Sequence, residues 1–173
     1  VLFRTKLDDV RISDGKISSV TLKNGDKTET FSPYALVLAV GHSARDTFGM
    51  LKNRAVAMKA KDFAVGVRIE HLQEKISFAQ YGKEYVNLPP ADYKLVSHAA
   101  DRAAFTFCMC PGGYVMPASG ETGCVVTNGM SNYARDGKNA DSALIVPVGK
   151  RDFKSDDVLA GVEFQRTIER KAF

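Results

Sequence analysis

The sequence predicts a β-rich α+β fold, in which a small antiparallel meander is followed by a larger, mixed β-sheet. Three observations predict it: two hairpin dipeptides in the first 25 residues, an unbroken apolar run at residues 35–40, and further strand-like apolar segments after residue 62. The chain has 173 residues, of which 45% are hydrophobic and 25% charged, so it can bury a substantial core.

The meander is predicted over residues 1–32. Asp14-Gly15 and Asn24-Gly25 are typical of two-residue hairpin turns, because such turns need positive φ at both positions. Apolar residues that alternate with polar ones flank both turns, and this alternation is typical of half-buried strands.

The apolar run at residues 35–40 predicts a different kind of strand. An unbroken run is typical of a strand covered on both faces, as in a parallel sheet. Gly41 ends the run, and Ser43 is predicted to cap a helix with Asp46 in its first turn. The backbone N–H groups of such a turn favour an anionic ligand, but the same pattern also fits an ordinary strand-to-helix turn.

The second half of the chain predicts five more strands and a final helix. A polar loop is predicted over residues 128–141, a linker over 149–156, and a helix capped by Ser155 after it. The strands are predicted at residues 63–69, 93–97, 104–110, 123–127 and 142–148.

Charge and composition narrow the function classes. The net charge is only +4 and there is no long basic run, so a nucleic-acid partner is not expected. No stretch approaches the roughly 20 apolar residues of a membrane helix, so we expect no membrane partner. Three cysteines and no leader-like segment favour the cytoplasm. Because the chain starts at Val1 and ends inside a helical pattern, we expect it to be a piece of a longer protein.

Two local motifs could carry chemistry. Cys108 and Cys110, with His98 and Cys124, could supply four zinc ligands, but the spacing differs from known zinc sites, so no metal site is predicted. Small buried hydrophobic thiols are the favoured interpretation. The glycine pair after Pro111 permits close approach to a flat ligand, although an ordinary turn explains it as well.

The order of these elements resembles a known superfamily. A meander followed by Leu36-Val37-Leu38-Ala39-Val40-Gly41 resembles the FAD-dependent flavoproteins of the glutathione-reductase type, with Val40 where their motif usually has Thr. Longer segments look like the bacterial FAD-dependent, or NAD(FAD)-utilising, dehydrogenases. These segments are residues 41–48, 63–71, 105–113, 126–131 and 159–166.

The resemblance implies FAD as cofactor and leaves NAD(P) open as a second electron carrier. It implies that Ala39, Val40, Gly41 and His42 form a wall of the FAD site. The GxGxxG unit that holds the ADP half of FAD is absent from this sequence. The remainder of the same polypeptide is therefore the expected partner. A flavin-dependent RNA-modifying enzyme is a weaker alternative, because the chain lacks a basic stripe.

The resemblance also divides the chain into four segments. They are the meander and last strand of a partial FAD-binding domain (1–41), a helix and connector (42–62), an inserted β-rich domain over the substrate (63–148), and a linker with a return helix (149–173). Candidate pocket residues in the inserted domain are Cys110, Gly112, Gly113, Asn128, Ser131 and Arg135. A redox role for Cys110 is a hypothesis that requires an exposed thiol with a depressed pKa.

The functional prediction is the middle portion of an FAD-dependent oxidoreductase acting on a small molecule. The 173-residue chain alone is expected to lack FAD and to be inactive. The alternative is a non-enzymatic β-rich binding or interaction module, because alternating strands and glycine loops serve protein contacts equally well.

Overall fold

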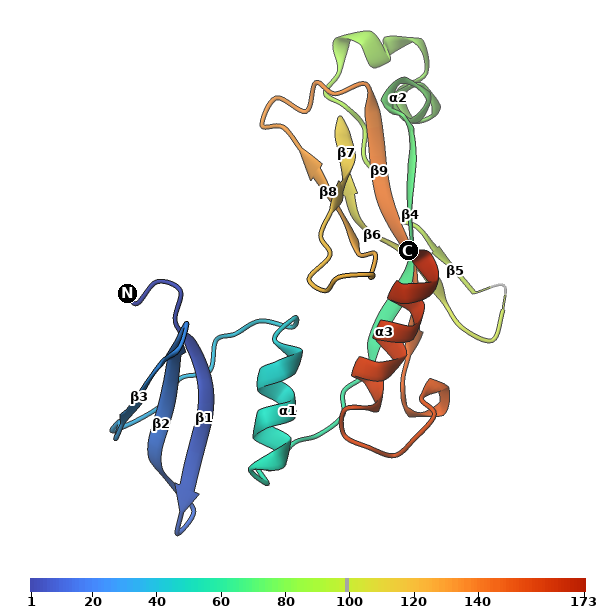
Figure 1. The fold of residues 1–173 in the computed structure, drawn as a ribbon. Coiled ribbons are helices and arrows are strands. Elements are labelled where there is room, and N and C mark those ends of the chain that lie inside the picture. The colour runs from blue at the N-terminus through green and yellow to red at the C-terminus, as the bar shows by residue number, and fades with distance from the viewer. Residues whose placement is uncertain (99) are drawn as a thin grey trace. The chain divides into compact units, whose positions relative to one another are not determined.

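A computed structural model describes residues 1–98 and 100–173. The chain forms two compact units, which are described separately below. Unit 1 contains residues 1–60 and 157–162, and unit 2 contains residues 61–156 and 163–173. The secondary structure is β-rich with three α-helices, which confirms the predicted α+β class (Figure 1). No helix among the described residues is long and apolar enough to span a bilayer.

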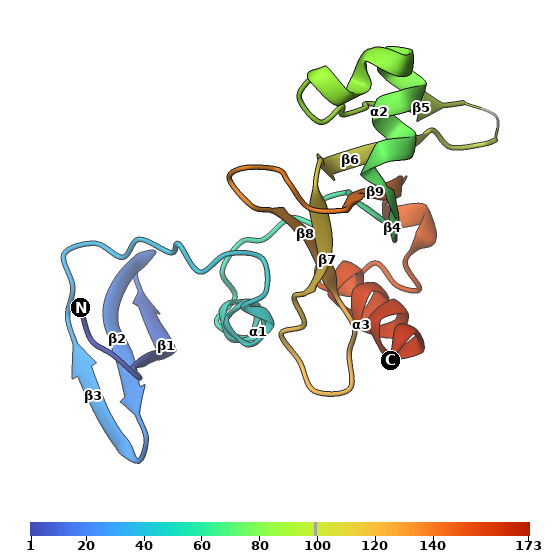
Figure 2. The same cartoon turned by 90° about the horizontal axis from the view of Figure 1, so that it is seen from above.

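The meander prediction is confirmed in unit 1. Strands β1 (Lys6–Ser13), β2 (Lys16–Asn24) and β3 (Lys27–Phe31) form one antiparallel sheet in that order (Figures 1 and 2). Asp14 and Gly15 both have positive φ, 54° and 72°, as the hairpin turn requires. The core of this unit contains Val10 of β1 and Val20 of β2, which pair with each other and are almost fully buried.

The predicted strand at residues 35–40 is wrong. The segment has no strand pairing, and Val37 and Val40 are 86% and 43% exposed. A strand that is buried on both faces needs hydrogen-bonding partners on its two sides. The three strands of unit 1 pair only with one another, so they offer this segment no partner.

Helix α1 (Arg45–Asn53) follows Gly41 as expected, but Ser43 does not cap it. The N-cap residue is Ala44, and no side chain caps the helix. Asp46 in the first turn accepts a hydrogen bond from the backbone N–H of Thr47 at 2.8 Å instead. The carboxylate of Asp46 in the first turn therefore satisfies one of the free N–H groups at the helix start, a role that was predicted for Ser43.

Unit 2 is built on a four-stranded sheet in the order β4 (Phe63–Leu72), β9 (Asn139–Val148), β6 (Ala104–Cys110), β5 (Val96–Ser97). The sheet was predicted to be mixed, but each of these pairings is antiparallel. Strands β4 and β9 pair along ten residues each. A Cβ at Gly66 would overlap the carbonyl of Leu144, so glycine allows β4 and β9 to approach closely here.

A second, two-stranded sheet packs against the first. Strands β7 (Gly113–Pro117) and β8 (Thr127–Ser131) form it, and both contact β9 (Figure 1). The predicted strand at 123–127 and loop at 128–141 are therefore wrong in position. Asn128 and Gly129 are typical loop residues, but here they pair with Met116 and Val115 of β7.

Helices complete unit 2, which contains the last helix from residue 163 onward. After β4 come α2 (Gln73–Tyr81) and the 3₁₀-helix η1 (Gly82–Asn87), while η2 (Lys150–Asp152) and α3 (Ala160–Ala172) follow β9. The final helix begins at Ala160, so Ser155 is not its cap. Phe164 of α3 joins Phe63 and Phe153 in an aromatic cluster with ring centroids 5.6–6.2 Å apart.

Candidate functional site

The predicted cofactor wall lies in an exposed loop of unit 1. Ala39, Val40, Gly41 and His42 are all exposed and precede helix α1. Gly41 has φ +73°, and an added Cβ would meet no atom within 4 Å, so space beside this residue is open. Positive φ is a conformation that residues other than glycine adopt at a cost, and the open side leaves the backbone accessible to a flat ligand.

The start of helix α1 already holds an anion of its own. Asp46 forms an ion pair with Lys6 at 2.8 Å, and the lysine together with the N–H of Thr47 lowers the pKa of this carboxyl group. A carboxylate at a helix N-terminus satisfies the same partial charge that would attract a phosphate. The loop is therefore suited to contact a ring, and the helix start is not a ready phosphate site.

A buried ion pair forms the centre of unit 2. Arg68 of β4 donates to Oδ1 of Asp141 on β9, and the two side chains are 6% and 0% exposed. The same Nη1 of Arg68 lies 3.3 Å from the carbonyl oxygen of Cys108. Burying a charge is costly unless it is paired, so this pair fixes where the hairpin of β7 and β8 can sit.

Two glycines on the inner face of that hairpin make room for the pair. A Cβ at Gly129 would overlap the guanidinium of Arg68 and Oδ1 of Asp141. A Cβ at Gly113 would lie 2.9 Å from Oδ2 of Asp141. Both glycines face the same way because Gly129 pairs with Val115, two residues along the strand from Gly113. The glycines are thus required by packing against a buried charge.

Gly112 is held in the turn before β7. Its φ is +58°, and its N–H donates to Oε1 of the buried Gln73 at 2.8 Å. The amide nitrogen of Gln73 donates in turn to Ser77 and to the carbonyl of Ala91, at 3.1 and 2.9 Å. These hydrogen bonds connect α2 to the turn before β7 and hold the turn in place.

Cys110 does not meet the condition set for a redox role. Burial raises the pKa of its thiol, and the charge of Asp141 raises it further, while Arg68 opposes both. Cys108 is exposed, with φ +45°, at a β-bulge between Phe107 and Cys110. The bulge breaks the strand alternation between the two cysteines.

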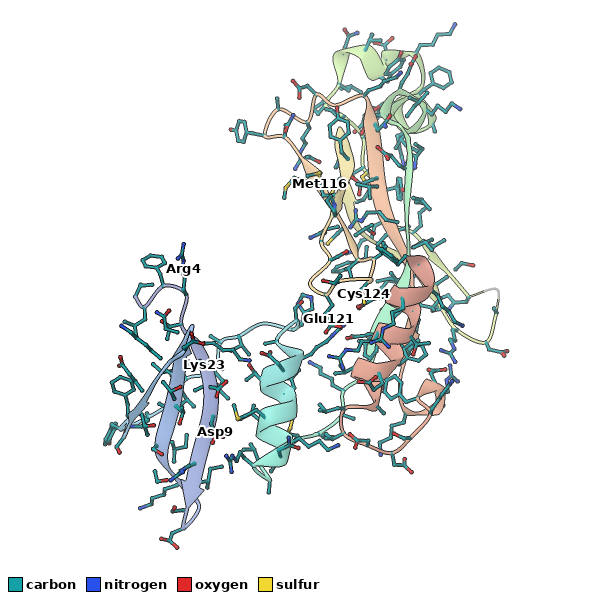
Figure 3. All side chains as sticks on the ribbon, in the orientation of Figure 1. Arg4, Asp9, Lys23, Met116, Glu121 and Cys124 are labelled. Carbon is teal, nitrogen blue, oxygen red and sulfur yellow. The ribbon has the colours of Figure 1, made fainter. Side chains whose placement is uncertain are left out.

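The structure brings some of the predicted pocket residues together and separates others. Cys110, Gly112, Gly113 and Ser131 gather around the inner side of the hairpin, where Ser131 pairs with Gly113. Asn128 is exposed and pairs with Met116, which is labelled on β7 in Figure 3. Arg135 is also exposed, and its backbone lies beside Gly112.

The loop between β7 and β8 is attached to helix α3. Arg166 donates to both carboxylate oxygens of Glu121, a residue labelled in Figure 3. The N–H of Val125 donates to the carbonyl of Glu169 at 2.9 Å. Cys124 in this loop is 5% exposed. Within residues 1–98 and 100–173, no three His, Cys, Asp or Glu side chains are placed to hold a metal ion.

Sequence reasoning missed Arg68, Asp141 and Gln73. The two members of the ion pair are 73 positions apart, so no short motif connects them. Gln73 lies in a helix that has a weak apolar pattern and for which no prediction was made. The only sequence signal of the buried pair was indirect, because the glycines at positions 113 and 129 leave the space that it fills.

Comparison with known proteins identifies the family. Residues 62–173 match the family described as FAD-dependent protein, C-terminal domain-like, which is more than half of the chain. The chain belongs to this family. An uncharacterized protein of Clostridium beijerinckii is 49% identical over 177 residues, which include the whole of this chain. The chain spans only 32% of that relative's length.

The loop at residues 39–42 lies outside the range that matches this FAD-dependent family. Its geometry nevertheless suits a flavin ring, because the open side of Gly41 is flanked by the exposed apolar Val40. Because Asp46 already occupies the helix start, the loop does not supply a pyrophosphate cradle. The open backbone at Gly41 beside an apolar side chain is compatible with a flat ring such as a flavin.

Proposed function

We propose that this chain is the substrate-side portion of an FAD-dependent oxidoreductase, in which residues 39–42 form one wall of the flavin site. The match of residues 62–173 to an FAD-dependent family carries the proposal. The length of the relative supports the further proposal that the chain acts as part of a longer polypeptide, whose remaining segments are its partners. When bound, FAD would supply the electron-transfer chemistry.

The role of the loop is to present backbone to the flavin. Gly41 allows close approach, and the exposed side chain of Val40 excludes water from the edge of a bound ring. The exposed apolar side chains of residues 35–40 support a surface that other segments of the polypeptide cover, since an apolar run left in water is unfavourable.

The role of unit 2 is to shape the substrate pocket. Cys110, Gly112, Gly113 and Ser131 would set the shape of the hairpin from behind, while Asn128 and Arg135 would contact the substrate from the surface. An exposed amide and an exposed guanidinium suit a small polar or anionic molecule. We also propose segment boundaries at residues 41, 62 and 148 for the cofactor portion, the connector and the substrate portion.

We further propose that the full-length protein is a cytoplasmic dehydrogenase. Three free thiols, at Cys108, Cys110 and Cys124, support a reducing compartment. NAD(P) as the second electron carrier is tested by adding NADH or NADPH to the purified full-length protein without oxygen. Bleaching of the yellow flavin by either nucleotide supports that assignment, and a colour unchanged by both excludes these nucleotides as donors.

A matched pair of glycine variants tests the wall. Gly41 and Gly25 both have positive φ and open space around the position of a Cβ, so alanine introduces similar strain at each. We expect Gly41→Ala in the full-length protein to weaken FAD binding, while Gly25→Ala, in a turn of the meander, leaves it unchanged. Equal FAD affinity in the two variants would show that residues 39–42 do not touch the flavin.

A further inference from the structure

The four-stranded sheet of unit 2 has an exposed apolar stretch on one of its faces. Arg68 and Asp141 point to the face that carries the hairpin of β7 and β8. Because side chains alternate along a strand, Val67 and Ile69 of β4 lie on the opposite face. Leu144 of β9 pairs directly with Val67, so it lies on that opposite face as well. These three side chains, called the open face below, are 62%, 37% and 40% exposed.

The two ends of β4 are covered on this same face. Phe63 at the start of the strand lies against Phe164 of α3, with ring centroids 6.2 Å apart. His71 near the end of the strand stacks on Tyr93, with ring centroids 5.6 Å apart. The open face is therefore the middle of a surface that other elements of unit 2 already cover at both ends.

The composition of the strands is typical of a sheet that is covered on both faces. An antiparallel sheet with one face in water alternates apolar and polar side chains. Strand β9 instead has an unbroken apolar run at residues 143–146, and residues 63–67 of β4 carry no polar side chain. Adjacent apolar side chains left in water are unfavourable, so this composition favours a cover over the open face.

The remaining part of the polypeptide is favoured over a second copy as the cover. Residues 62–173 match a family described as a C-terminal domain, and the chain spans only 32% of its relative's length. A standard interface between separate chains takes roughly 20–30 residues from each side. The open face has only three large apolar side chains, which suits a segment that the polypeptide itself holds at a high effective concentration.

We propose that segments of the full-length polypeptide outside residues 1–173 pack apolar side chains on the open face. The proposal rests on the proposed function, in which this chain is part of a longer polypeptide, but it does not involve the loop at residues 39–42. Packing at this face would fix the substrate portion against the rest of the enzyme. The connector at residues 42–62 would then not have to position that portion alone.

Cysteine labelling of the full-length protein tests the proposal. Val67→Cys places a thiol on the open face, and Val86→Cys is the matched control, because Val86 is also a valine and is 67% exposed on η1. We expect maleimide to label Val67→Cys about tenfold more slowly than Val86→Cys, because a covered thiol is not accessible to the reagent. Equal labelling rates would overturn the proposal.

Two details keep this measurement decisive. Peptide mass spectrometry distinguishes the introduced thiol from the three native cysteines. Ile69→Cys, on the same face, replaces Val67→Cys if that variant does not fold. Slow labelling that becomes fast when the protein is diluted to monomers would assign the open face to a second copy and overturn the proposal, whereas slow labelling at every concentration supports it.

The flavin content of the same samples separates this proposal from the proposed function. Equal labelling rates in a protein with stoichiometric FAD would overturn the packing surface and leave the flavin role standing. Slow labelling of Val67→Cys in a protein that binds no FAD would support the packing surface and contradict the flavin role.

Discussion

The guanidinium of Arg68 and the carboxylate of Asp141 meet in the interior of unit 2, from neighbouring strands β4 and β9, with 6% and 0% of their side chains exposed. An ion pair this deeply buried is costly to break, because the remaining charge has no water around it. The pair therefore controls how the hairpin of β7 and β8 packs on the four-stranded sheet.

Breaking this pair should unfold unit 2 much more readily. We expect Arg68→Met or Asp141→Asn to lower the free energy of unfolding by about 3–5 kcal/mol, measured by urea denaturation. Lys6→Met is the matched control, because the Lys6–Asp46 pair is 55% and 59% exposed. An exposed pair of this kind contributes about 0–1 kcal/mol. Similar losses for the buried and the exposed pair would contradict the interpretation.

The end of helix α1 offers a stabilising substitution. Ala55 has φ +54°, and its N–H donates to the carbonyl of Lys52, while that of Val56 donates to Leu51, as in a Schellman motif. Because alanine is strained at positive φ, we expect Ala55→Gly to stabilise unit 1 by about 1 kcal/mol. The midpoint of thermal unfolding measures this stabilisation. Destabilisation by Ala55→Gly would show that the helix does not end in this geometry.

Acid should weaken unit 1 through Asp9. Arg54 donates two hydrogen bonds to this carboxylate, and they lower its pKa below the ordinary 3.8. The charged form is thus favoured by folding, so the stabilisation is present above pH 3.8 and is lost as the pH falls through the lower folded value. We expect Asp9→Asn to reduce the loss of stability below pH 3.8, followed by circular dichroism. If the dependence of stability on pH is unchanged by the substitution, Asp9 does not contribute to the loss of stability in acid.

The meander was predictable from local turn chemistry, but the hairpin of β7 and β8 was not. Asp14 and Gly15 both have positive φ for reasons contained in two residues, so this turn could be predicted directly. The second turn was predicted one residue too early, because Asn24 still pairs with Lys27 and only Gly25 of the predicted dipeptide has positive φ. Gly129 is a glycine because Arg68 and Asp141 occupy the space of its side chain. That cause is distant in sequence, and Asn128-Gly129 was therefore interpreted as a loop. Local rules fail where tertiary packing selects the residue.

In the candidate site, too, local features could be predicted from the sequence and features that depend on tertiary pairing could not. Gly41 and its positive φ follow from the pattern of an apolar run, a glycine and a helix. The strand at 35–40 did not form because a strand needs partners, and its own residues cannot supply them. Pairs such as Cys110 and Asp141 depend on the register of β6 and β9 after a bulge, which no single-sequence rule gives.

The three thiols should react in a fixed order with iodoacetamide. Cys108 is exposed, Cys110 is half-buried with a raised pKa, and Cys124 is 5% exposed. Since the thiolate is the reactive form, we expect labelling of Cys108 first, Cys110 next and Cys124 last, followed by peptide mass spectrometry. Labelling of Cys110 before Cys108 at neutral pH would contradict the protonated, shielded thiol.

The flavin content of the full-length protein tests the central claim most directly. FAD released by denaturation is measured against protein concentration for the full-length protein and for the 173-residue chain alone. We predict one FAD per full-length chain and none in the 173-residue chain, because the latter offers only one wall of the site. A full-length protein that is purified folded and without flavin, and that takes up none when FAD is added, would contradict the account and favour a non-enzymatic β-rich module.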